Sequence, residues 1–138
     1  ALAPRSAAAQ LNYAAALLVN RRQPEEACKL TLQLLQKNPG SPIAIVNHSL
    51  ALAMNRRTRE AESLLERVKP RGGDTVEAAV CNLAWFEIHR DLGRFDAAWA
   101  DLDGIKAEHL FPNQGQWLEQ QRRQLPPRAK LSSQLKGP

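Results

Sequence analysis

The stretch Asn47-His48-Ser49 is the second of three copies of one phrase, preceded by Asn12-Tyr13-Ala14 and followed by Asn82-Leu83-Ala84. The first residues of these copies, at positions 12, 47 and 82, are 35 residues apart. A second phrase keeps the same interval, since Asn20-Arg21-Arg22 recurs as Asn55-Arg56-Arg57. A fixed period of this length is typical of stacked helical units, because one unit alone cannot bury its own apolar face.

Start and stop signals between these phrases predict seven helices and no strand. Ser6, Ser41, Thr58 and Asn113 are suited to cap helices, and Asp74-Thr75-Val76-Glu77 has the spacing of a capping box. Asn38-Pro39-Gly40, Pro70-Arg71-Gly72-Gly73, Gly93 and Pro126-Pro127 are suited to end them. The expected helices cover about residues 6–20, 24–38, 42–55, 58–69, 74–92, 94–110 and 114–125, with Gly104 tolerated inside the sixth.

The repeat resembles the tetratricopeptide repeat family. Its helix pairs recur at about 34 residues, with a small residue in the first helix, an alanine early in the second and a proline after it. The small residues are Ala14, Ser49 and Ala84, the alanines are Ala27, Ala61 and Ala97 or Ala98, and the prolines are Pro39 and Pro70. The resemblance implies an all-α, right-handed α-solenoid of about three helix pairs plus a C-terminal capping helix.

We therefore expect one repeat domain over residues 1–125. Its repeats are expected at about 6–40, 41–73 and 74–111, with a capping helix at 114–125 and a basic, disordered tail at 126–138. Residues 1–121 carry fourteen basic and fourteen acidic side chains, so the formal net charge of +5 belongs to the last 17 residues. The chain lacks the run of about 18 apolar residues that a membrane-spanning helix needs.

In the family, a ligand binds in a concave groove lined by the first helices, on their side away from the second helices. Regularly spaced asparagine amides can bond an extended peptide, and a tryptophan among apolar side chains can anchor it. The asparagines are equally suited to bond a neighbouring repeat. Carried onto this sequence, the groove residues are Asn12, Ala15, Val19, Asn47, Leu50, Met54, Asn82, Trp85 and His89.

Arginines gather at the turns between paired helices and could form a basic edge for an acidic partner. Cations at helix C-termini also complement the helix dipole, and acidic residues lie close by, which favours a structural role. The arginines of this edge are Arg21, Arg22, Arg56, Arg57, Arg90 and Arg94. Glu87 stands where the first two repeats have Leu17 and Leu52, so we expect it to pair with Arg90 or Arg94, unless the helix is rotated.

No signature of catalysis is present in the sequence. It has no glycine-rich phosphate loop after a strand, and its three histidines lack metal-ligand spacing, so no catalytic residue, metal or cofactor is expected. Cys28 and Cys81 lie in different repeats and are expected to be small buried hydrophobes, which leaves the cytoplasm and the periplasm both open.

The sequence thus predicts a non-enzymatic adaptor, scaffold or chaperone-like module that binds a peptide or helix of a protein client in its groove. The functions common among members of the family, together with the Arg/Ala-rich composition, suggest a role in bacterial secretion or envelope assembly. The alternative is a scaffold that binds a polyanion, such as nucleic acid, acidic polysaccharide or lipid headgroups, through the arginine edge and the basic tail. Self-association through the groove is a third hypothesis.

Overall fold

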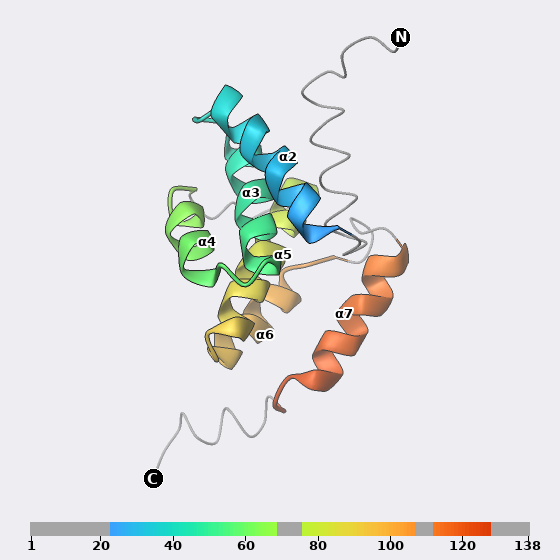
Figure 1. Cartoon of the computed structure of the whole chain (residues 1–138). Coiled ribbons are helices and arrows are strands. Elements are labelled where there is room, and N and C mark those ends of the chain that lie inside the picture. Colours follow the sequence, from blue (N-terminus) through green and yellow to red (C-terminus); the bar gives the residue numbers. More distant parts are fainter. Residues whose placement is uncertain (1–22, 69–75, 107–111, 128–138) are drawn as a thin grey trace.

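The computed structural model describes residues 23–68, 76–106 and 112–127. These residues form six helices and no strand, so the all-α prediction is confirmed for this part of the chain (Figure 1). The helix predicted at 6–20 and the tail from residue 128 onward lie outside the described residues. The helices are α2 (Pro24–Lys37), α3 (Pro42–Met54), α4 (Thr58–Leu65), α5 (Val76–Asp91), α6 (Phe95–Asp103) and α7 (Pro112–Gln124).

The first two described helices begin and end where the sequence predicts. α2 has Pro24 at its first position, where the missing N–H is not needed, and it ends just before Asn38-Pro39-Gly40. Ser41 caps α3, and its side chain accepts a hydrogen bond from the Ala44 N–H at 3.4 Å. α5 ends before Gly93, whose φ of +74° is in the left-handed region that favours glycine.

Four helix boundaries differ from the prediction. Thr58 begins α4 rather than capping it, because its hydroxyl donates a hydrogen bond to Asp91 Oδ2 at 3.3 Å. α4 already ends at Leu65, before the predicted stop. Gly104 does not lie inside a longer α6 but forms its C-cap. α7 begins at Pro112, so Asn113 lies within its first turn instead of preceding it.

α3 is the central helix of the described fold. It packs against α2, α4 and α5, and it lies between α2 and α4 in Figure 1. Its ten consecutive residues 44–53 are all buried, so it has no solvent-facing side. A helix that is apolar almost all round is expected to be buried in this way. The first core cluster forms around it and includes Ile45, Leu50, Leu65, Cys81 and Ile88.

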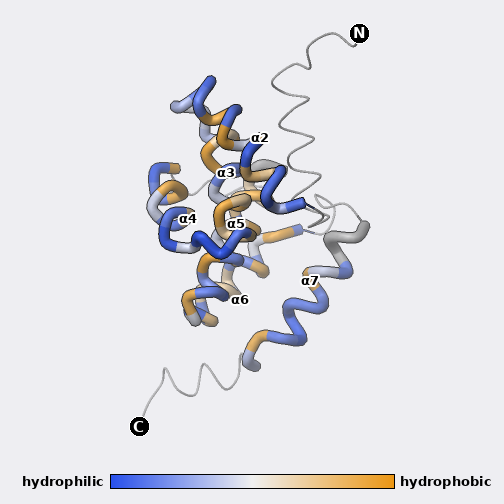
Figure 2. Tube along the Cα trace, in the orientation of Figure 1, coloured by the Kyte–Doolittle hydropathy of each residue, from blue (hydrophilic) through white to orange (hydrophobic). Residues whose placement is uncertain are grey.

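A second core cluster joins α5, α6 and α7. Phe86 of α5 is fully buried and makes an edge-to-face contact with Trp117 of α7, with ring centroids 5.7 Å apart. Leu118 of α7 and Leu125, the residue directly after α7, belong to the same cluster. α7 is otherwise mostly hydrophilic, as Figure 2 shows, so these few apolar side chains hold it in place. Trp99 Nε1 of α6 donates to the Pro126 carbonyl at 2.8 Å, just beyond the helix.

The small residues and the alanines of the repeat have the same burial in each copy that the structure describes. Ser49 of α3 and Ala84 of α5 are both fully buried, as expected of the small first-helix residues. The second-helix alanines, Ala27, Ala61 and Ala98, are fully buried too, so Ala98 rather than Ala97 takes this position. Among the six described helices, none is long and apolar enough to cross a membrane.

Candidate interaction surface

The predicted groove residues lie in three different environments. Asn12, Ala15 and Val19 are outside the described residues. Asn47 and Leu50 of α3 are only 3% and 5% exposed, so this part of the predicted groove is not at the surface. The half-buried members of the set are Met54, Asn82, Trp85 and His89.

Trp85 and His89 of α5 form an ordered aromatic pair. One turn separates them, and their rings stack with centroids 5.2 Å apart and an interplanar angle of 16°. Trp85 also packs against the first core cluster. The Asp101 carboxylate of α6 accepts a hydrogen bond from His89 Nδ1 at 2.6 Å, which fixes the imidazole. We call these three residues the aromatic site.

The neighbourhood of the aromatic site is partly desolvated. Burial raises the pKa of the Asp101 carboxyl, while the hydrogen bond and the charge of His89 act in the opposite direction. Burial also raises the pKa of the Cys81 thiol, and the negative charge of Asp101 adds to this effect. Cys81 is thus a protonated, buried thiol at neutral pH, as the sequence predicts, whereas Cys28 is only half-buried.

The orientation predicted for Asn82 and His89 of α5 is wrong. Asn82 and His89 were expected to face away from the second helix of their pair, but both bond to α6 or its C-cap. Asn82 Nδ2 donates to the Gly104 carbonyl at 3.2 Å, and His89 bonds Asp101. The close approach of Gly104 explains this, because a Cβ there would lie 2.8 Å from Asn82 Nδ2. Asn82 therefore has a structural role between α5 and α6.

The described arginines of the predicted basic edge all have acidic neighbours. Arg57 pairs with Glu60 at 2.6 Å, and Arg94 pairs with Glu62 at 2.6 Å. Arg56 Nη1 lies 3.7 Å from Asp91 Oδ1, although 83% of its side chain is exposed. Arg21 and Arg22 lie outside the described residues. These pairs reduce the net charge that the edge presents to a polyanion.

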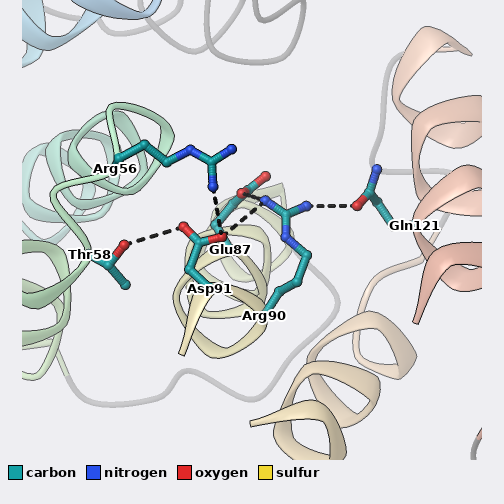
Figure 3. A network of polar contacts seen from close by, with 6 residues as sticks. All are labelled: Arg56, Thr58, Glu87, Arg90, Asp91 and Gln121. Carbon is teal, nitrogen blue, oxygen red and sulfur yellow. Dashed lines mark hydrogen bonds and ion pairs between the residues drawn. The ribbon is translucent and has the colours of Figure 1, made fainter. Parts of the chain in front are cut away.

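Arg90 is the centre of a polar network that joins α5 to α7 (Figure 3). Its guanidinium pairs with Glu87, which is 1% exposed, so the pairing with Arg90 expected from the sequence is confirmed. Nη1 of Arg90 donates to Gln121 Oε1 of α7 at 2.7 Å. Asp91 lies 3.5 Å from the same guanidinium and links the network to Arg56 and Thr58. The network ties the α3–α4 turn, α5 and α7 together.

Sequence reasoning missed two polar contacts that fix α2. Thr31 Oγ1 of α2 lies 2.9 Å from His48 Nδ1 of α3, in the buried contact between the two helices. Asn55 Nδ2 donates to the Pro24 carbonyl at 2.8 Å and to the Ala51 carbonyl at 2.7 Å. The recurrence of Asn20-Arg21-Arg22 as Asn55-Arg56-Arg57 could have indicated a structural role for this asparagine.

Within residues 23–68, 76–106 and 112–127, no cluster of three or more histidine, cysteine or acidic side chains could hold a metal ion. The comparisons with known proteins add no relative. No family model, curated protein or solved structure matches this chain.

Proposed function

We propose that the chain is a non-enzymatic protein-interaction module, in which the aromatic site contacts a segment of a partner protein. The observation that carries this proposal is the preordered Trp85 ring. Tryptophan is enriched among the residues that dominate binding energy, and a side chain that is already fixed loses little entropy on binding. Stacking on His89, which Asp101 holds, provides this order at a half-buried position.

The arrangement that we propose is a tetratricopeptide-like α-solenoid. In such a stack, each first helix packs on the first helix of the next pair. The contact of α3 with α5 and the full burial of the small residues and alanines of the repeat support this arrangement. α7 packs on α5 and α6 through Leu118 and Leu125, which is the place of a capping helix. The partner would then meet the exposed edge of the α5–α6 pair.

A capture experiment tests the proposal. The immobilised chain is exposed to lysate of the source cells, and retained proteins are compared between wild type and Trp85→Ala. Leu32→Ala is the matched control, because Leu32 of α2 is an apolar side chain with 42% exposure, away from the aromatic site. We expect wild type and Leu32→Ala to retain the same proteins and Trp85→Ala to lose them, with unchanged helix content by circular dichroism. Equal retention by all three chains would refute the proposal.

A further inference from the structure

α2 is held mainly by its contact with α3. Among the described helices its principal neighbour is α3, and its buried residues are Ala27, Thr31 and Leu34. One of these three, Thr31, is polar, and its hydroxyl oxygen lies 2.9 Å from His48 Nδ1 of α3. Asn55 adds the hydrogen bond to the start of α2. A change at His48 thus acts on a buried polar link in the α2–α3 contact.

The hydrogen bonds of Thr31 define the state of His48. The Thr31 hydroxyl donates its single hydrogen to the Cys28 carbonyl at 3.1 Å. With the hydroxyl hydrogen directed to Cys28, Thr31 Oγ1 accepts from His48, and Nδ1 of the imidazole is the nitrogen that carries a hydrogen in this arrangement. In the neutral ring the basic site is Nε2, and acid adds a proton there. His48 is 6% exposed, so this proton would bring a positive charge into the buried contact.

The surroundings of His48 oppose that charge. Burial lowers the pKa of His48, the positive charge of Arg57 lowers it further, and Glu60 has a smaller effect in the opposite direction. On α2, the ionisable side chain near Arg57 is Cys28. Burial raises the pKa of this thiol, so it stays neutral. With a folded pKa below the unfolded value of about 6.5, the unfolded chain binds more protons. The contribution to stability is complete above about pH 6.5 and is lost as the pH falls.

We propose that the α2–α3 contact is an acid-sensitive joint, in which protonation of His48 weakens the packing of α2 while α5 and α6 stay together. The contact between α5 and α6 responds differently. There, protonated His89 faces the Asp101 carboxylate at 2.6 Å, and the two opposite charges attract. The device does not require a partner at the aromatic site.

Hydrogen exchange of the full chain, corrected for intrinsic rates, tests the joint. Between pH 7.5 and 5.5 we expect the protection of α2 amides to fall by up to about tenfold, the limit for an unfolded pKa of about 6.5. The protection of α5 amides should change by less than about twofold. His48→Gln keeps a side-chain N–H but cannot titrate, so its α2 protection should be independent of pH. His89→Gln is the matched control and should keep the wild-type fall in α2.

An equal fall in wild type and His48→Gln, or no fall in wild type, would overturn the proposal. Because His48→Gln can disturb the core, a second measurement uses the wild-type chain only. Nuclear magnetic resonance gives the titration midpoints of the His48 ring and of the α2 amide shifts. We expect one common midpoint, below about 6.5. Two different midpoints, or a His48 midpoint above that value, would equally overturn it.

Discussion

Glu87 and Arg90 form an ion pair on α5 in which the carboxylate is buried and the guanidinium is about one quarter exposed. The same guanidinium bonds Gln121 of α7 and lies 5.3 Å from the centroid of the Phe86 ring. One side chain thus neutralises a buried charge, covers an aromatic ring and bonds the next helix. The repeat has leucine at the equivalent position 52, so this pair distinguishes α5 from α3.

Arg90→Ala should be strongly destabilising, because it leaves the buried Glu87 carboxylate without this cation. We expect a loss of about 2–3 kcal/mol in the free energy of unfolding, measured by urea denaturation. Gln121→Ala removes the hydrogen bond between Arg90 and α7 and should cost about 1 kcal/mol. The double variant Glu87→Leu/Arg90→Leu should be more stable than Arg90→Ala, since it buries no charge. If Arg90→Ala costs no more than Gln121→Ala, the pair does not stabilise α5 as argued.

The turns after α3 and α5 allow a matched test of backbone conformation. Arg56 has φ of +65°, a conformation that is costly for residues with a side chain, whereas Gly93 has φ of +74°. Arg56→Gly should stabilise the chain by about 0.5–1 kcal/mol, because its exposed ion pair with Asp91 contributes little. Gly93→Ala should destabilise it by about 1 kcal/mol. Thermal melts of both variants show whether each change raises or lowers the stability. A change in the same direction for both variants would contradict the account.

Ser49 offers a test of a buried polar group. Its side chain is fully buried on α3, and its hydroxyl has no hydrogen-bond partner in the described part of the chain. Ser49→Ala removes the unsatisfied group and keeps the small size that close packing needs. We expect it to be neutral or stabilising by up to about 1 kcal/mol in urea denaturation. Ser49→Val, which adds volume in a closely packed site, should instead destabilise the chain. A clear loss for Ser49→Ala would show that the hydroxyl is satisfied.

Gly104 and Asn82 should be coupled. A Cβ at residue 104 would lie 2.8 Å from Asn82 Nδ2, so Gly104→Ala should displace the amide and break its bond to the residue 104 carbonyl. We expect each single variant to lose about 1 kcal/mol and the double variant Asn82→Ala/Gly104→Ala to lose much less than the sum. A double-mutant cycle measured by urea denaturation checks this. Strict additivity would mean that the two residues act independently.

Much of the helical order follows from local chemistry. The Ser41 cap, the break at Asn38-Pro39-Gly40 and the turn at Gly93 depend on neighbouring residues, and the structure confirms all three. The Glu87–Arg90 pair could also be predicted from the sequence, because an acid at a leucine position needs a partner within one turn. The end of α6 could not be predicted in this way, since the position of Gly104 depends on Asn82, 22 residues earlier.

The groove was less predictable because it depends on which helix is central. Residues 44–53 of α3 have almost no polar side, and this composition predicts burial all round rather than a groove-lining face. The resemblance to the repeat family placed Asn47 and Leu50 on a binding face. The partners of His48 and His89 lie on neighbouring helices, so single-chain spacing could not identify them.

Photo-crosslinking tests the central claim most directly. Trp85 is replaced by benzoylphenylalanine, a photoreactive aromatic residue of comparable size, and the chain is irradiated in the presence of the captured partner. The same residue at position 32 is the control. The account predicts a covalent product between the partner and position 85 and none with position 32. A product at position 32 together with none at position 85 would contradict it.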